Sequence, residues 1–162
     1  MFKAESQVIV DLSDSDTRFQ RTLERELQAA GLSKCHQCGV CTATCPVREI
    51  EEKFNPRKIM KLAKLGLKDL VLDNEFIWLC SMCFMCEERC PQDVKPPDVM
   101  TVLRNIAAKE NKIPSNIAKL MEILAENGRI YPLDDFTIEL REDDDLPSIT
   151  PEPEFVKKIA EA

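Results

Sequence analysis

Glycine is scarce in this sequence, with 4 residues in 162. Their positions fit neither the GxGxxG nor the GxxxxGK pattern, so no glycine-rich loop for nucleotide phosphates is expected. Long apolar runs are also missing, because no stretch approaches the roughly 18 apolar residues that a membrane span requires. The sequence therefore predicts neither a nucleotide-binding loop of these types nor a membrane span.

Positive charge is equally limited, and the formal net charge is −7. Nine acidic residues stand against a single arginine between Asp134 and Glu154, so the negative charge is concentrated there and the rest of the chain is nearly neutral. No basic patch with interleaved aromatic residues occurs. Nucleic-acid binding is not expected, since it depends on such a patch.

Cysteine, in contrast, is abundant, and its eight residues form two arrays of identical spacing. The arrays are Cys35-x2-Cys38-x2-Cys41-x3-Cys45-Pro46 and Cys80-x2-Cys83-x2-Cys86-x3-Cys90-Pro91. This spacing is typical of proteins with two 4Fe-4S clusters, in which the fourth cysteine of each array binds the other cluster. We therefore predict two 4Fe-4S clusters as the cofactors. The predicted ligands are Cys35, Cys38, Cys41 and Cys90 for the first cluster, and Cys80, Cys83, Cys86 and Cys45 for the second.

Disulfides and zinc are the alternatives to this interpretation. Disulfide frameworks are typical of short secreted chains, but the first residues show no basic region followed by an apolar run, and a cytoplasmic location with reduced thiols is expected. Zinc sites usually combine two cysteine pairs across a longer loop. They require neither a third cysteine two residues after the second nor a proline after the fourth. The pattern favours iron and sulfur over both alternatives.

Apolar residues at helical spacing occur before, between and after the two arrays. The sequence predicts a helix after Ser13 or Asp14, another after Asn55-Pro56, a third from Pro96, and a fourth over residues 116–127. In the fourth helix, Leu120 and Met121 are expected to pack inward. The 34 residues between Cys45 and Cys80 indicate helix rather than the short hairpins of small bacterial ferredoxins.

The predicted fold is all-α: an alpha-helical ferredoxin whose pseudo-twofold relation follows from the repeated array. An N-terminal arm is expected over residues 1–14, with a possible strand or docking segment at 8–10. The ferredoxin domain is expected over residues 15–130. Residues 131–162 are rich in proline and acid, which predicts an extended tail that lies on a partner or is partly disordered.

Several side chains near the arrays are assigned supporting roles. His36, the only histidine, is expected to lie beside the first cluster or to face a partner, because cysteines complete the ligand set. Arg89 and Lys95 could raise the potential of the second cluster or pair with a partner carboxylate. The basic face of the helix after Pro56 is expected to be solvated, with partner docking as the alternative. Its residues are Arg57, Lys58, Lys61, Lys64 and Lys68.

Other residues extend the comparison to a known family. They are Cys35-His36-Gln37-Cys38-Gly39-Val40-Cys41-Thr42, Gly66-Leu67-Lys68-Asp69, Trp78, Glu88-Arg89-Cys90-Pro91, and Arg104-Asn105 with Ala107-Ala108-Lys109. With these residues the chain resembles the C subunit of heterodisulfide reductase, found in methanogens and other anaerobes, from roughly residue 30 to residue 145. The arrays alone also resemble those of succinate and glycerol-3-phosphate dehydrogenases.

The resemblance implies an oxidoreductase subunit that has no substrate site of its own. It would relay electrons from a flavin-containing A subunit to a B subunit that reduces the mixed disulfide of coenzyme M and coenzyme B. Its own contribution would be to position two clusters and to tune their potentials. An iron-sulfur subunit of another anaerobic dehydrogenase or reductase, or a free ferredoxin-like carrier, is the alternative.

Overall fold

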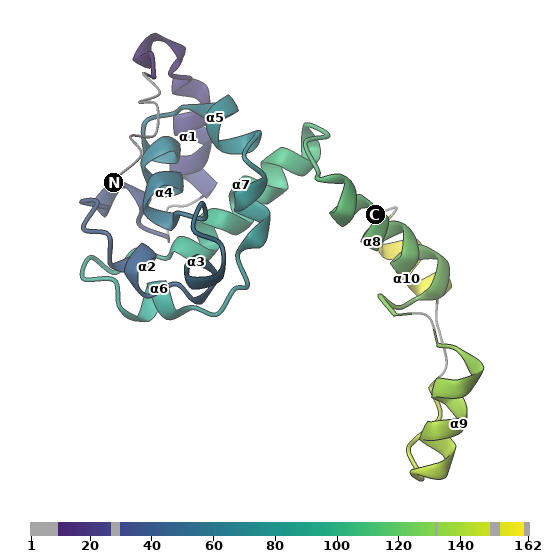
Figure 1. The fold of residues 1–162 in the computed structure, drawn as a ribbon. Helices are drawn as coiled ribbons and strands as arrows, with labels where there is room; N and C mark the ends of the chain where they lie inside the picture. Colours follow the sequence, from purple (N-terminus) through teal and green to yellow (C-terminus); the bar gives the residue numbers. More distant parts are fainter. Residues whose placement is uncertain (1–9, 27–29, 132, 150–152, 161–162) are drawn as a thin grey trace, which may run out of the picture. The chain divides into compact units, whose positions relative to one another are not determined.

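The computed structural model describes residues 10–26, 30–131, 133–149 and 153–160, and all regular secondary structure within these residues is helical (Figure 1). The prediction of an all-α fold is confirmed. The chain divides into two compact units, Met1–Lys112 and Ile113–Ala162, and each is described by itself. The domain boundaries expected after residues 14 and 130 stay predictions. Most of the expected N-terminal arm, including residues 8 and 9, lies outside the described residues.

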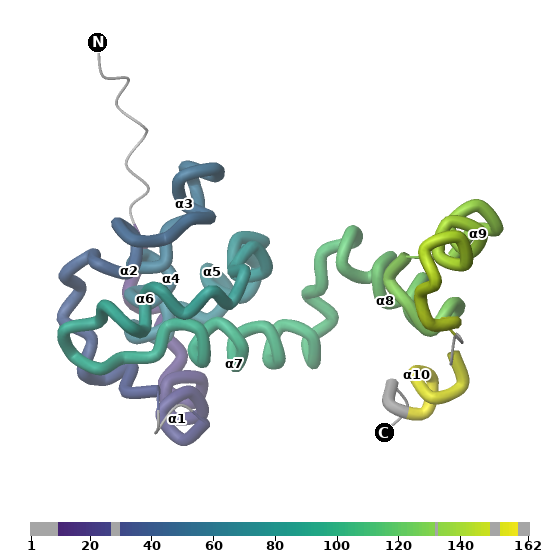
Figure 2. The backbone as a smooth tube through the Cα atoms, turned by 90° about the horizontal axis from the view of Figure 1, so that it is seen from below, coloured from purple at the N-terminus to yellow at the C-terminus, as the bar shows by residue number. Residues whose placement is uncertain are grey.

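The first unit contains three longer helices and several short ones. The longer helices are α1 (Thr17–Glu26), α4 (Pro56–Lys64) and α7 (Pro96–Lys109). The short α-helices are α2 (Val40–Ala43), α3 (Pro46–Ile50), α5 (Lys68–Leu72) and α6 (Met85–Glu88), and the 3₁₀ helices are η1 (Leu12–Asp14), η2 (Leu32–Lys34) and η3 (Glu75–Leu79). Helices α2 and α6, which belong to different arrays, lie side by side (Figures 1 and 2).

The first α-helix begins later than the sequence indicated. Ser13 and Asp14, the expected caps, lie in η1 instead. The carboxylate of Asp16 accepts hydrogen bonds from the backbone N–H groups of Arg18 at 2.8 Å and Phe19 at 3.1 Å. These bonds satisfy donors that the first turn of α1 leaves free, so Asp16 takes the role of the cap.

Helix α4 begins and ends as its sequence predicts. The side chain of Asn55 accepts a hydrogen bond from the N–H of Lys58 at 3.0 Å, and Pro56 occupies the first helical position. The chain leaves the helix through Gly66, whose φ of +71° is readily adopted by glycine alone. A Cβ atom at Gly66 would also lie 2.6 Å from the side chain of Gln20, so the close contact with α1 requires glycine.

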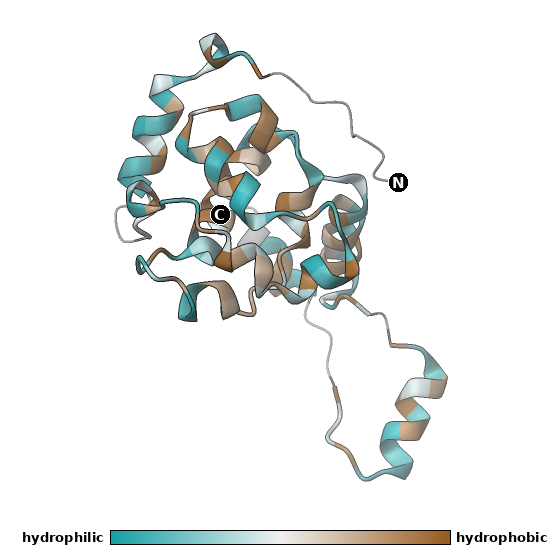
Figure 3. Ribbon diagram, turned by 60° about the vertical axis from the view of Figure 1, so that its left-hand side comes forward, coloured by the Kyte–Doolittle hydropathy of each residue, from teal (hydrophilic) through white to brown (hydrophobic). Residues whose placement is uncertain are grey.

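The hydrophobic core lies among α1, α4, α5 and α7. Its fully buried side chains include Leu23, Phe54, Ile59, Met60, Val71, Leu72, Ile77, Val99, Met100 and Leu103. Apolar and polar residues alternate along the helices that surround this core (Figure 3). Burying one side chain of this size contributes about 1.5–3 kcal/mol, so this shared core is the main force holding the helices together.

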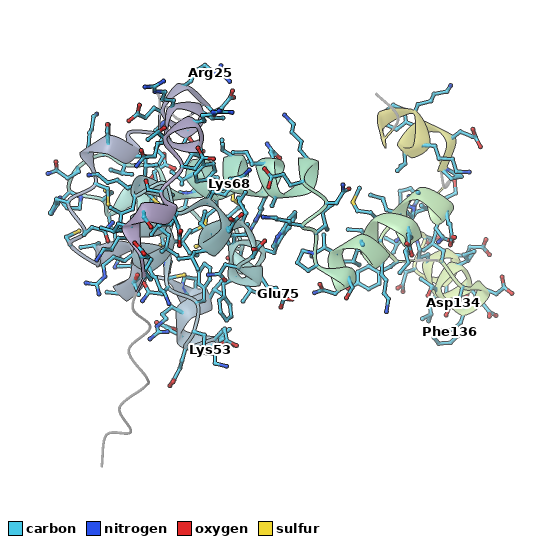
Figure 4. The ribbon with its side chains drawn as sticks, turned by 90° about the horizontal axis from the view of Figure 1, so that it is seen from above. Arg25, Lys53, Lys68, Glu75, Asp134 and Phe136 are labelled. Atoms are coloured by element: carbon cyan, nitrogen blue, oxygen red, sulfur yellow. The ribbon has the colours of Figure 1, made fainter. Side chains whose placement is uncertain are left out.

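Ion pairs join α5 to the end of α7. Lys112 Nζ lies 2.9 Å from Asp73 Oδ1 and 3.2 Å from Asp69 Oδ1. The hydrogen bond to Asp73 is the main reason that the pKa of Lys112 is raised. Lys68, labelled in Figure 4, pairs with Glu110 at 2.6 Å. These partly exposed pairs fix the two helix ends against each other, although each contributes modestly to stability.

The second unit contains α8 (Ser115–Asn127), α9 (Asp135–Asp143) and α10 (Pro153–Ala160). The expected extended tail is therefore wrong for two segments, one of which begins where Asp134 accepts a hydrogen bond from the N–H of Thr137 at 2.8 Å. None of the described residues in this unit is buried. Leu120 and Met121, expected inside, are 40% and 53% exposed, and Phe136 is 68% exposed (Figure 4). The unit is too short to enclose a core of its own.

Candidate metal centre

The two arrays are built alike. In each half a 3₁₀ helix, η2 or η3, ends at the first cysteine, and Cys35 and Cys80 have nearly identical backbone angles, with φ of −62° and −60°. Short helices α2 and α6 then follow Gly39 and Phe84, both in the left-handed conformation. After its Cys-Pro pair the first half forms α3 and then α4, whereas the second half passes through a turn into α7; α4 and α7 both begin with proline. The pseudo-twofold relation expected from the repeated spacing is therefore visible in the local structure.

Cationic side chains at equivalent positions bind the backbone at the start of each array. Lys64 Nζ donates to the carbonyl oxygens of Ser33 at 2.9 Å and Cys35 at 2.8 Å. Arg104 donates through Nε to Ile77 O at 2.8 Å and through Nη2 to Cys80 O at 2.7 Å. Both cations lie eight residues after the proline that begins their helix. Each helix therefore anchors the first cysteine of its own half.

Two cavities of similar size receive the thiols. The first has an empty volume of about 380 Å³ and is lined by Cys35, Cys38, Cys41, Cys86 and Cys90. The second has an empty volume of about 390 Å³ and is lined by Cys45, Cys80, Cys83 and Cys86. The structure thus brings together the two sets of cysteines that the sequence grouped, with the fourth cysteine exchanged between halves.

The apolar side chains that line each cavity also come from both halves of the unit. Residues at equivalent positions line the two cavities. Val94, Pro96 and Met60 line the first, and Phe54, Pro56 and Met100 line the second. Each cavity therefore takes a helix-starting proline from the opposite half and a buried methionine from its own, and the second cavity is also lined by Pro96 and Pro97 of its own half. Apolar walls of this kind keep water away from a cofactor, which is a main control on its potential.

The donor chemistry of these cavities fits 4Fe-4S clusters. Gln37 Nε2 donates to Cys35 Sγ, and the N–H of Val94 donates to Cys90 Sγ, both at 3.3 Å. Hydrogen bonds to sulfur are among the features by which proteins adjust cluster potentials. The cysteines fit because at least four soft sulfur donors line each cavity.

Two of the thiols, those of Cys41 and Cys86, have raised pKa values that favour their neutral form. Burial raises the pKa of Cys86 to about 12, and the nearby thiols of Cys80, Cys41 and Cys45 act in the same direction. Burial also raises the pKa of Cys41. Binding of a cluster by these two thiols would therefore release protons, and the positive charge of iron would stabilise the thiolates.

Three important side chains were not identified from the sequence. Arg57, expected on a solvated face, lines the first cavity, whereas the equivalent position at the second is Pro97. Lys64 and Arg104 were not expected to bind the array backbone. The only signal that could have found them is their equal distance from Pro56 and Pro96. His36 is exposed and lines the first cavity, and its expected place beside a cluster stays a prediction.

Comparison with known proteins agrees with this geometry. Residues 31–94, which contain all eight cysteines, match the model of the 4Fe-4S dicluster domain. An iron-sulfur C subunit of the CoB–CoM heterodisulfide reductase of Methanocaldococcus jannaschii is 36% identical over 80% of this chain and 69% of its own length. The C subunit of the ferredoxin:CoB-CoM heterodisulfide reductase of Methanosarcina mazei is 34% identical over 86% of this chain and 85% of its own length.

The chain belongs to the family of heterodisulfide reductase C subunits. It is thereby an iron-sulfur component of an oxidoreductase complex, and the expectation of 4Fe-4S clusters is supported by the dicluster domain. The similarity to these family members extends over most of the chain, well beyond the arrays. No helix within the described residues is long and apolar enough to cross a membrane.

Proposed function

We propose that the chain relays electrons through two 4Fe-4S clusters, from a flavin-containing A subunit to a disulfide-reducing B subunit. The observation that carries the proposal is that two equivalent cavities, lined by five and by four cysteines, share the side chain of Cys86. Two clusters held there would be neighbours, as a relay requires. Each 4Fe-4S cluster supplies one-electron chemistry when it is bound.

The protein's own residues provide position and environment. Cys35, Cys38, Cys41 and Cys90 would hold one cluster, and Cys45, Cys80, Cys83 and Cys86 the other. Lys64 and Arg104 fix the backbone of the first cysteine in each array. The apolar walls exclude water, and Arg57 places a positive charge at the first cavity alone.

The naming of the relatives supports a role within a multi-subunit complex. The relative from Methanococcus maripaludis, 35% identical over 82% of this chain and 71% of its own length, is the C2 subunit of an H₂/formate:CoB-CoM heterodisulfide, ferredoxin reductase. We place the present chain in the cytoplasm, where cysteines remain reduced and available to iron. Reduction of the coenzyme M–coenzyme B disulfide would occur on the B subunit.

Reconstitution from separate subunits tests this function. The cluster-loaded chain alone should accept electrons from dithionite, seen as bleaching of its visible absorption, yet should not reduce the mixed disulfide. Addition of the flavin-containing and disulfide-reducing subunits should restore the reaction, and omission of this chain should abolish it. Disulfide reduction by the chain alone, or failure of both subunits to bind it, would favour another dehydrogenase or a free carrier.

A further inference from the structure

The two halves differ sharply at three equivalent positions beside the arrays. The pairs are Lys34 and Leu79, Gly39 and Phe84, and Val40 and Met85. On the second array all three positions carry large apolar side chains that are 43%, 45% and 37% exposed, in chain order. On the first array they carry a cation, a glycine and a half-buried valine. Since the backbones are alike, the difference does not arise from the fold.

The central member of the apolar set is held in a strained conformation. Phe84 has a φ of +62°, in the left-handed region that bulky residues avoid, whereas Gly39 adopts φ of +89° at the same place in the first array without strain. Glycine would therefore serve the second array better if only folding mattered. Gln37 and Met82, which are equivalent in the two arrays, also have positive φ values of 65° and 54°, so this conformation alone does not mark a functional residue. The contrast with Gly39 shows that the local fold needs no side chain at this position, and the phenylalanine ring is therefore available for another role.

Two of these side chains both line the second cavity and face outward. Phe84 and Met85 belong to the cavity wall, yet both remain exposed to solvent. A protein that covered them would therefore be separated from the cavity by a single layer of side chains. Electron transfer slows steeply with distance, so this is a favourable place for exchange with another redox centre. An apolar cover would also keep water out of that path.

We propose that Leu79, Phe84 and Met85 form a docking surface for a redox protein whose own centre lies beneath a complementary apolar surface. The first array, with Lys34 and Arg57 nearby, offers a polar and cationic face and does not fit the same partner. Aromatic and methionine side chains are enriched at protein interfaces, and an exposed aromatic anchor is the usual centre of such a contact. The inference rests on the proposed relay function and adds which cavity this partner approaches.

The test compares four full-length, cluster-loaded chains: wild type, Phe84→Gly, Phe84→Tyr and Leu70→Ala. Phe84→Gly removes the ring and reproduces the glycine of the first array, while Phe84→Tyr keeps an aromatic surface. Leu70 is 47% exposed on α5 and lines neither cavity, so it is a matched control. The redox subunits that co-purify with the wild-type chain are separated from it, and their affinity for each chain is measured.

Phe84→Gly should bind its redox partner about ten-fold more weakly or worse, with wild-type iron content and wild-type bleaching by dithionite. Phe84→Tyr and Leu70→Ala should stay within about two-fold of wild type. Unchanged affinity of Phe84→Gly would overturn the proposal. Loss of iron from the free Phe84→Gly chain would also overturn it, because the ring would then be a shield for the cluster.

Two other occupants of the docking surface would give distinct results in this test. If a second copy covers the surface, light scattering will show a wild-type dimer that becomes a monomer in Phe84→Gly. If the chain's own second unit covers it, amide exchange in α8 to α10 of the free chain will accelerate in Phe84→Gly. Either result overturns docking of a redox protein. If the chain binds redox subunits other than the flavin-containing and disulfide-reducing ones, the proposed function is refuted but the docking surface is still tested. If the chain binds no redox subunit, both the proposed function and the docking surface are overturned.

Discussion

Arg104 donates a hydrogen bond from Nη2 to the carbonyl oxygen of Cys80 at 2.7 Å. The bond ties α7 to the start of the second array, and Lys64 ties α4 to Cys35 in the same way. Each array is thus anchored within its own half at its first cysteine but contributes its fourth cysteine to the cavity of the other half. The geometry of both cavities depends on these two kinds of connection together.

Loss of the Arg104 anchor should weaken the second cavity. Arg104→Met keeps a long apolar stem but leaves two carbonyl groups without their donor, at a cost of about 2 kcal/mol. For a domain of this size that corresponds to a fall on the order of 10 °C in the temperature at which the visible absorption bleaches. Lys64→Met is the matched change in the first half. Because Lys64 is exposed, its loss should cost about 1 kcal/mol or less. Equal effects would contradict this account.

The exchanged cysteines can be tested one at a time. Cys45→Ala should damage the cluster whose other proposed ligands are Cys80, Cys83 and Cys86, and should leave a signal from the first. Cys90→Ala should do the reverse. Electron paramagnetic resonance of each reduced variant distinguishes the two signals. If Cys45→Ala instead removes the cluster beside Cys35, each array holds its own cluster.

Removal of iron should unfold the region between Cys35 and Cys90. Each proposed cluster links two distant segments, and small metal-dependent domains lose their folding energy with the metal. Circular dichroism of the chelated chain should show reduced helix content and no cooperative melt, both restored by reconstitution. Native helix content with a cooperative melt in the iron-free chain would mean that the apolar core is sufficient alone.

The charge of Arg57 should raise the reduction potential of the first cluster. Reduction adds negative charge, which a nearby cation stabilises, so Arg57→Gln should lower that potential by an amount on the order of tens of millivolts. Lys58→Gln removes the same charge from the next residue, which does not line the cavity, and should have a smaller effect. Potentiometric titration followed by paramagnetic resonance measures both. Equal shifts would show a general effect of surface charge.

Much of the first unit could be predicted from local signals. Asn55 with Pro56 predicted the start of α4, and the repeated spacing predicted two groups of thiols, which line two cavities that share Cys86; the ligand sets themselves stay predictions. These features are local because capping and ligand spacing involve residues close together in the chain. The cap of α1 was placed wrongly because Ser13, Asp14 and Asp16 all have suitable side chains, and the 3₁₀ helix that separates them has no distinct pattern.

Contacts between residues far apart in the sequence could not be predicted from local signals. Arg57 and Arg104 look like ordinary helix-surface cations, and only the folded chain brings them to a cavity or to the backbone of Cys80. The amphipathic pattern of Met121 indicated burial, yet the second unit has too few residues to cover it. Periodicity shows which face of a helix is apolar, but not whether anything covers that face.

The exchange of cysteines also constrains how the protein is made. A ribosome synthesises Cys35, Cys38 and Cys41 early, but the first cavity gains its fourth thiol only when Cys90 emerges. An incomplete chain that ends between the arrays therefore has no finished binding site for either cluster. If the two clusters bind as proposed, iron delivery would follow synthesis of both halves, and truncated products would lack the cofactor.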